Sequence, residues 1–207
     1  MNIHQQFRIT VYKIASVHKE MENYQLNPKN WSQETYIKAF NKAAHAHQGQ
    51  KIPGSEIPYI VHLNFVSMEV IAALNVETEH DGNLAIQCAI LHDTIEDTDT
   101  TFKEIKTEFG ESVANGVLAL TKDESLAKHL QMADSLQRIK KQPQEIWMVK
   151  LADRISNLQA PPHYWTQDKI IRYREEGIRI YEALQDASPF LASRLAKLIE
   201  DYKVFIK

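Results

Sequence analysis

Hydrophobic residues recur along this chain mostly at the spacing of one face of an α-helix, three or four residues apart. Polar stretches containing Gly, Pro, Asn or Asp, which end helices and form turns, separate these segments. No segment has the alternating pattern of a β-hairpin, so the sequence predicts an all-α fold of about nine to ten helices. The predicted helices cover approximately residues 9–17, 32–48, 59–74, 82–97, 102–110, 111–120, 125–141, 144–158, 166–184 and 189–205.

Several helix starts are marked by residues that accept hydrogen bonds from free backbone amides. Ser32 is the predicted N-cap of the second helix. Thr100 or Thr101, followed by Glu104 in the first turn, has the pattern of a capping box. Between the second and third helices, residues 49–58 contain two prolines and two glycines, which predicts an irregular loop.

Length and composition favour one soluble globular domain. The chain has 207 residues, of which 43% are hydrophobic and 25% charged, values that exclude wholesale disorder. We expect a single domain over residues 31–207, preceded by a helical extension over residues 1–30. Neither the role of this extension nor the oligomeric state follows from the sequence.

Charge, cysteine content and the lack of long apolar runs limit the possible partners and cellular locations of the protein. The net charge of −3 provides no field to attract a nucleic acid polymer, so an anionic substrate has to be held by a few local cations. Cys88 is the only cysteine and lies in an apolar stretch, which predicts a buried thiol. No apolar run approaches the roughly 20 residues that cross a bilayer, and no signal peptide is evident, so we expect a cytoplasmic protein without a membrane partner.

Residues 91–98 contain the densest group of side chains able to bind metal or transfer protons. They include His92, Asp93, Glu96 and Asp97 and follow a largely apolar helix. If that helix continued through them at about 100° per residue, all four would point into one arc of roughly 140°. Buried charges need partners, and metal coordination is one way to supply them.

Two further ligand-type residues end apolar segments, namely His62 and Asp153. Together with His92 and Asp93 they give two imidazoles and two carboxylates, a set that suits manganese, iron or zinc at a hydrolytic site. Each has a structural alternative. His62 alone could be a hydrogen-bonded core histidine, and Asp153 could pair with the adjacent Arg154.

Glu96 and Asp97 would remain free for a second task if the other four residues bound a metal. They could then orient and deprotonate a water molecule, although a solvated helix end is the simpler reading of two adjacent carboxylates. His45 and His47 lie two residues apart on a helix and face different directions, so we do not expect them to share a metal.

Four stretches of the chain, taken together and in order, resemble the HD-superfamily hydrolase domain of RelA/SpoT proteins, and specifically a stand-alone small alarmone hydrolase. The resemblance covers roughly residues 34 to 185. The stretches are AHAHQGQ at 44–50, PYIVH at 58–62, LHDTIEDT at 91–98 and KLADRISNL at 150–158.

This resemblance implies a manganese-dependent enzyme that removes the 3′-pyrophosphate of a purine alarmone such as ppGpp. It implies metal binding by the two histidines and two aspartates, and activation of water by Glu96 and Asp97. It also implies a contact between Asn157 and the nucleotide. Further candidate substrate contacts are Lys51, Tyr59, Lys122, Arg154 and Tyr173.

Two departures from the family pattern affect the substrate. The family usually carries an Arg-Lys pair before Pro-Tyr-Ile, whereas this loop is one residue longer and retains only Lys51. A threonine often found after the family's asparagine is replaced here by Ala160, followed by Pro161 and Pro162. Hydrolysis of (p)ppApp or of another nucleotide such as NADPH is therefore an alternative.

A protein that only binds nucleotides on an HD scaffold is the alternative outside the enzymes. Loss of catalysis should remove at least one of the six metal-binding and catalytic candidates. All six are present, which favours an enzyme.

Overall fold

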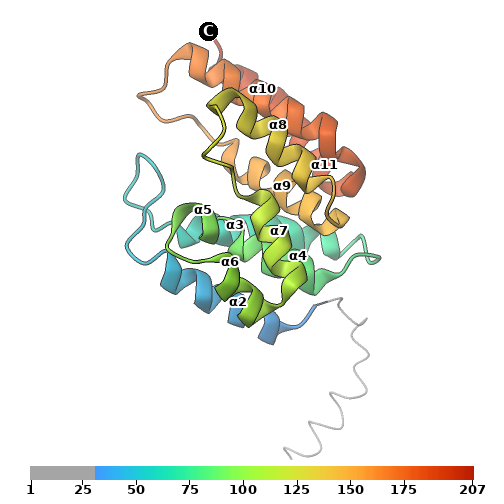
Figure 1. Cartoon of the computed structure of the whole chain (residues 1–207). Coiled ribbons are helices and arrows are strands. Elements are labelled where there is room, and N and C mark those ends of the chain that lie inside the picture. The colour runs from blue at the N-terminus through green and yellow to red at the C-terminus, as the bar shows by residue number, and fades with distance from the viewer. Residues whose placement is uncertain (1–30) are drawn as a thin grey trace, which may run out of the picture.

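The computed structural model describes residues 31–207, so the helix and extension expected within residues 1–30 lie outside the described part. The described chain is built from helices joined by loops (Figure 1), and its only β-type pairing is an isolated bridge between Lys51 and Pro58. The all-α prediction is confirmed. The α-helices are α2 Gln33–Ala46, α3 Ile60–Leu74, α4 Gly82–Leu91, α5 Thr94–Asp97, α6 Phe102–Phe109, α7 Glu111–Leu120, α8 Lys128–Ile139, α9 Gln144–Asn157, α10 Gln167–Leu184 and α11 Pro189–Asp201, and the 3-10 helices are η1 Gln185–Ala187 and η2 Tyr202–Phe205.

The predicted start signals act as expected. Ser32 precedes α2, and its hydroxyl oxygen accepts a hydrogen bond from the backbone N–H of Thr35 at 3.1 Å. Before α6, Thr101 and Glu104 form the reciprocal bonds of a capping box. These contacts satisfy amides that have no partner inside the helix, and they fix where each helix begins.

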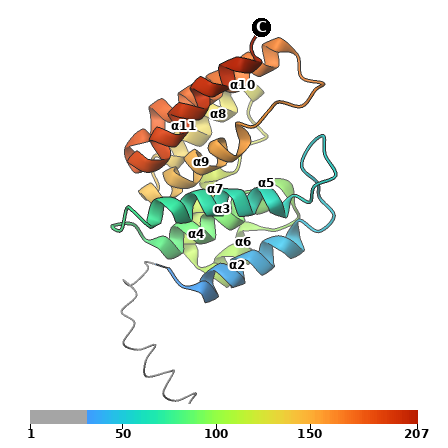
Figure 2. The ribbon, with the colours of Figure 1, turned by 180° about the vertical axis from the view of Figure 1, so that it is seen from behind.

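Helix α9 lies at the centre of the molecule. It packs against α3, α4 and α7 on one side and against α10 and α11 on the other (Figures 1 and 2). The stretch from Met148 to Ser156 is buried throughout. A helix buried around its circumference can hold a polar side chain in a water-poor position, provided that its neighbours supply partners.

Close packing between α7, α4 and α9 depends on Gly116. A Cβ atom at this position would lie 2.5 Å from Cδ1 of Ile146 and 2.8 Å from Sγ of Cys88. The absent side chain therefore lets α7 approach both neighbours. Cys88 is completely buried, as predicted, and its thiol faces the Val113 carbonyl oxygen at 3.8 Å.

No helix formed by residues 31–207 combines the length and the apolar character needed to cross a membrane.

Candidate active site

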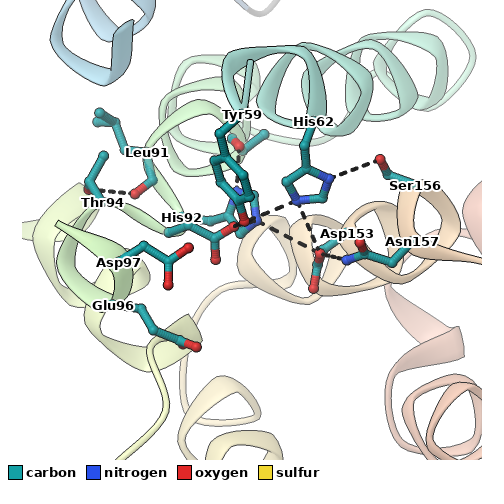
Figure 3. A network of polar contacts seen from close by, with 12 residues as sticks. Tyr59, His62, Leu91, His92, Thr94, Glu96, Asp97, Asp153, Ser156 and Asn157 are labelled. Atoms are coloured by element: carbon teal, nitrogen blue, oxygen red, sulfur yellow. Dashed lines mark hydrogen bonds and ion pairs between the residues drawn. The ribbon is translucent and has the colours of Figure 1, made fainter. Parts of the chain in front are cut away.

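Three helices deliver ligand-type side chains to one point in the core. His62 lies in the first turn of α3, His92 directly follows α4, and Asp153 lies in the last part of α9. One ligand atom from each of these three buried residues lies within 4.8 Å of the others. The side chains point toward one another across the gap between their helices (Figure 3). Residues far apart in the sequence thus form one compact cluster.

Asp93 adds a second carboxylate to this cluster. Its Oδ2 atom lies 2.8 Å from Nε2 of His92 and 3.6 Å from Nε2 of His62. The same oxygen accepts a hydrogen bond from the Tyr59 hydroxyl at 2.5 Å. Burial and the charge of Asp93 both raise the pKa of Tyr59, which keeps the phenol protonated as a donor.

The two imidazoles are oriented by their outer nitrogens. Nδ1 of His92 lies 2.9 Å from the carbonyl oxygen of Ala89, an acceptor, so this nitrogen carries a proton and donates. Nδ1 of His62 lies 3.2 Å from the hydroxyl oxygen of Ser156. The two Nε2 atoms are buried and form no hydrogen bond within residues 31–207. Outer contacts of this kind are those that orient histidines toward a metal, and the inward Nε2 atoms, each close to the carboxylates of Asp93 and Asp153, fit a divalent cation.

The charges in the cluster also fit a cation. Burial acts to lower the pKa of His92, but Asp93 and Asp153 outweigh this effect and raise the pKa to about 9. Burial acts to raise the pKa of Asp153, but Lys150 and His92 bring it down to about 2. The pKa of Asp93 also lies well below its usual value, because the neighbouring imidazoles outweigh the effect of burial. Both carboxylates are therefore ionised and favour a positive charge between them.

Two neighbours hold the Asp153 carboxylate in place. Asn157 donates to its Oδ1 at 2.5 Å, and Lys150 donates to its Oδ2 at 3.0 Å. All three residues lie on α9, where these spacings bring side chains to one face. The Asp153 side chain thus has a defined orientation, and Asn157 lies beside the cluster (Figure 3).

The continuous helix expected through His92, Asp93 and Asp97 is wrong. Helix α4 ends at Leu91, and Asp93, with φ −98° and ψ −1°, precedes the short helix α5. The Thr94 hydroxyl donates to the Leu91 carbonyl oxygen at 2.7 Å, which satisfies a carbonyl group at the end of α4. The four polar side chains therefore divide into two groups instead of sharing one helical arc.

Glu96 and Asp97 lie on α5, to one side of the histidine cluster (Figure 3). Glu96 accepts two hydrogen bonds from Lys122, one from the backbone N–H at 2.9 Å and one from Nζ at 2.5 Å. Asp97 accepts one from the Gln50 side-chain amide at 3.1 Å. Partial desolvation and the charge of Asp93 raise the pKa of Asp97, which makes its carboxylate a better proton acceptor.

A cavity of about 460 Å³ connects these two groups. Its volume lies within the usual range of small-molecule sites, about 300–1,000 Å³. Asp93, Asp153, Glu96 and Asp97 line it. Five of the predicted substrate contacts line it as well, namely Tyr59, Lys122, Arg154, Asn157 and Tyr173.

Lys51 is the one predicted substrate contact that does not line this cavity. Its ammonium group pairs with Glu56 in the same loop, and 51% of its side chain is exposed. Arg154 and Tyr173, in contrast, hold one another, with the guanidinium carbon 4.4 Å from the ring centroid. Arg154 also reaches Glu176 at 3.3 Å. The Arg154 guanidinium at the cavity is thus held by two residues of α10.

Sequence reasoning assigned no role to three residues that contact the site, and each lies within a stretch that resembles the family. Ser156 faces His62, Gln50 binds Asp97, and His47 lies 2.5 Å from Gln50 through its Nδ1 atom. Their position within these stretches was the only feature of the sequence that could have identified them as site residues. His47 is buried while His45 is exposed, and neither belongs to the metal-type cluster found among residues 31–207.

Comparison with known proteins gives the family. A sequence model described as the HD domain matches residues 39–190, which is most of the chain. The chain belongs to the HD domain family. Over 167 residues it is 32% identical to the guanosine-3′,5′-bis(diphosphate) 3′-pyrophosphohydrolase MESH1 of Danio rerio, covering 78% of this chain and 91% of the relative. The MESH1 protein of Xenopus tropicalis is 30% identical over 175 residues, covering 82% of this chain and 96% of the relative.

A solved HD domain structure has the same arrangement of helices. It is described as a metazoan ortholog of SpoT that hydrolyzes ppGpp and plays a role in starvation responses. The TM-score is 0.71 at 26% sequence identity, and the alignment covers 83% of this chain and 97% of the other. The resemblance stated from the sequence motifs is thereby confirmed at the level of family and fold.

Proposed function

We propose that this chain is a metal-dependent phosphohydrolase that removes the 3′-pyrophosphate of a purine alarmone and converts (p)ppGpp into GDP or GTP and pyrophosphate. One observation carries the proposal. The inward Nε2 atoms of His62 and His92 meet Asp153 at the wall of a cavity that also contains carboxylates and cations. The names of the relatives support the choice of substrate.

The metal ligands in this proposal are His62, His92, Asp93 and Asp153, and the metal is Mn²⁺. Imidazole nitrogens with carboxylate oxygens are a ligand set that manganese accepts. When bound, the cation would acidify a water molecule and neutralise charge on the phosphate group. Tyr59 and Asn157 keep the two carboxylates oriented, because each donates a hydrogen bond to one of them.

Asp97 accepts the proton of the attacking water, and Glu96 orients that water. Two contacts support this division. Glu96 is already engaged twice by Lys122, whereas Asp97 accepts a single side-chain hydrogen bond and has a raised pKa. A base must be unprotonated before the step and must hold a proton after it, which a raised carboxylate pKa favours.

The reaction replaces one phosphorus–oxygen bond with another. The water oxygen bonds to the phosphorus attached to the ribose 3′-oxygen, and the bond between that phosphorus and the 3′-oxygen breaks. One proton of the water goes to Asp97, the departing 3′-oxygen takes up a proton from solvent, and Asp97 then returns its proton to solvent, so that the enzyme ends in its starting state. Pyrophosphate and a nucleotide with a free 3′-hydroxyl are the products.

Four cations line the cavity and compensate the charge of the substrate, namely Lys122, Lys128, Lys150 and Arg154. Arg154 is buried and fixed against Tyr173, so its guanidinium is preorganised toward phosphate oxygens. Lys122 can exchange its contact with Glu96 for one with phosphate. The rings of Tyr59 and Tyr173 offer apolar surface to the nucleoside.

A substrate panel tests the proposal. Purified protein with Mn²⁺ is incubated with ppGpp, ppApp, GTP and NADPH, and the products are separated so that pyrophosphate and monophosphate release are distinguished. We expect pyrophosphate from ppGpp, and no release in a parallel sample containing a chelator. The Glu96→Gln variant should lose turnover while it retains metal.

The other outcomes each have a defined meaning. Preference for ppApp would assign an adenine alarmone, for which the longer loop around Lys51 offers a reason. Monophosphate release from NADPH alone would assign a phosphatase. Binding of nucleotide without release from any substrate would leave a binding protein on an HD scaffold.

A further inference from the structure

We propose that His47 and Gln50 form a positioning pair that sets the orientation of Asp97: Gln50 holds the Asp97 carboxylate and His47 holds Gln50. The proposal rests on the role assigned above to Asp97. Neither residue reaches the metal-type cluster or lines the cavity described above. Both act through another side chain and are positioning residues.

The geometry forms a short chain of hydrogen bonds that starts in the core. His47 is the C-cap of α2 and is 4% exposed. Its Nδ1 atom lies 2.5 Å from Oε1 of Gln50, and Nε2 of Gln50 lies 3.1 Å from Oδ2 of Asp97. A buried residue of α2 is therefore connected to a carboxylate on α5.

Chemistry fixes the direction of every bond in this chain. An ionised carboxylate only accepts, so the Gln50 amide must turn its NH₂ group toward Asp97. Its carbonyl oxygen then faces His47 and needs a donor. Nδ1 of His47 must therefore carry a proton, which in a neutral ring leaves Nε2 without one. Nε2 of His47 is buried without a hydrogen bond to any described residue, so the contact of Nδ1 with Gln50 is what selects the tautomer.

The ring of His47 is held by a second contact. It stacks on Tyr59 with the centroids 5.1 Å apart, and Tyr59 donates to Asp93 at 2.5 Å. His47 is thus connected indirectly to both parts of the site. It is linked to Asp97 through Gln50 and to Asp93 through Tyr59. Displacement of this one side chain would disturb the spacing between a proposed metal ligand and the proposed base.

Nuclear magnetic resonance of the histidine ring nitrogens tests the donor directions without any substrate. We expect neutral His47 to carry its proton on Nδ1 in the wild-type protein, and to shift toward the Nε2–H form in the Gln50→Leu variant. A neutral His47 protonated on Nε2 in the wild type would overturn the proposal, whatever the enzyme activity.

Paired substitutions of His47 separate orientation from packing. The amide nitrogen of Asn lies near the position of Nδ1, so His47→Asn retains a donor while it removes volume. His47→Leu retains volume and removes the donor. If His47 orients Asp97, turnover should fall about 10–100-fold in His47→Leu and in Gln50→Leu, which is the usual cost of losing an outer-shell partner. Turnover should recover in His47→Asn.

Two controls complete the experiment. His45→Leu changes an exposed histidine two residues away and should leave turnover unchanged. Thermal unfolding and Mn²⁺ affinity, measured for each variant, should not follow the order of turnover, and KM should change less than kcat. Turnover in His47→Leu equal to or above that of His47→Asn would overturn the proposal.

Failure of the proposed function gives a different pattern. A wild-type protein that hydrolyses no member of the substrate panel would contradict the proposed reaction. The ring-nitrogen measurement would still decide whether Nδ1 of His47 donates to Gln50, because it needs neither turnover nor metal.

Discussion

The histidine cluster and the Glu96–Asp97 pair are neighbours but are supported in different ways. His62, His92 and Asp153 come from helices packed in the core, and they are buried. The pair lies on a four-residue helix and is held by side chains from elsewhere in the chain. A metal site needs fixed distances, which packed helices provide. A group that exchanges protons needs access to water, which the edge of a cavity provides.

The largest expected effect is at the metal cluster. Asp153→Asn should reduce turnover to background and should weaken Mn²⁺ binding by more than about 100-fold, since loss of an outer-shell partner alone costs 10–100-fold. Titration calorimetry measures the affinity. Asp168→Asn, at an exposed aspartate on α10, is the control and should bind metal normally. Unchanged affinity in Asp153→Asn would remove Asp153 from the ligand set.

At the Glu96–Asp97 pair we expect loss of turnover without loss of metal. Asp97→Asn should reduce kcat by about 10²–10⁴-fold, the usual contribution of a general base. Glu96→Gln should also lose turnover, and the loss should be smaller because Glu96 only orients the water. Steady-state kinetics together with Mn²⁺ titration separate the two properties. Metal affinity that falls in parallel with kcat would contradict the division between cluster and pair.

Mn²⁺ should stabilise the folded protein as long as the histidine cluster is intact, whether or not the Glu96–Asp97 pair is intact. A ligand that binds only the folded state at 100 times its Kd adds about 2.7 kcal/mol to the free energy of unfolding. Mn²⁺ should therefore raise Tm in the wild type and in Asp97→Asn, but not in Asp153→Asn. Differential scanning fluorimetry measures this shift. A rise that survives in Asp153→Asn would indicate a metal site elsewhere.

The smallest expected effect concerns the packing behind the cluster. Gly116→Ala places a methyl group against Ile146 and Cys88, and such overpacking costs about 1–3 kcal/mol of unfolding free energy. Urea denaturation measures this cost. Leu118→Ala, on the exposed side of the same helix, should cost less. If Gly116→Ala were as stable as the wild type, the contact of α7 with α4 and α9 would be looser than described.

Helix positions and the convergence of the cluster were predictable from the sequence. Periodicity and caps such as Ser32 act locally, and the three cluster residues lie in the first turn of α3, directly after α4 and in the last part of α9. The helix break at Asp93 was not predictable, because it depends on local competition for the Leu91 carbonyl group by the Thr94 hydroxyl. The spacing of hydrophobic residues carries no information about this hydrogen bond.

The partners of the Glu96–Asp97 pair were not predictable either. Lys122 and Gln50 reach it from distant positions in the chain, and only the assembled fold brings them together. Lys51 is the opposite case, in which the sequence predicts a contact that the structure does not show. Its place next to a family-like stretch predicts a substrate contact, whereas its side chain pairs with Glu56 and does not line the cavity. Contacts of long surface side chains depend on their neighbours in space, which residue type does not specify.

The break between α4 and α5 makes the order of His92 and Asp93 matter. Adjacent residues on an unbroken helix diverge by about 100°, whereas at this break Nε2 of His92 and Oδ2 of Asp93 lie 2.8 Å apart. At the break, His92 is the C-cap of α4 and Asp93 is the N-cap of α5, and the Asp93 carboxylate accepts from Tyr59 and makes no capping bond with the amides of α5. Exchanging the two residues would preserve composition and net charge but would remove the imidazole from the Ala89 carbonyl oxygen and the carboxylate from the Tyr59 hydroxyl. The dipeptide is therefore directional, and its reverse would not be an equivalent solution.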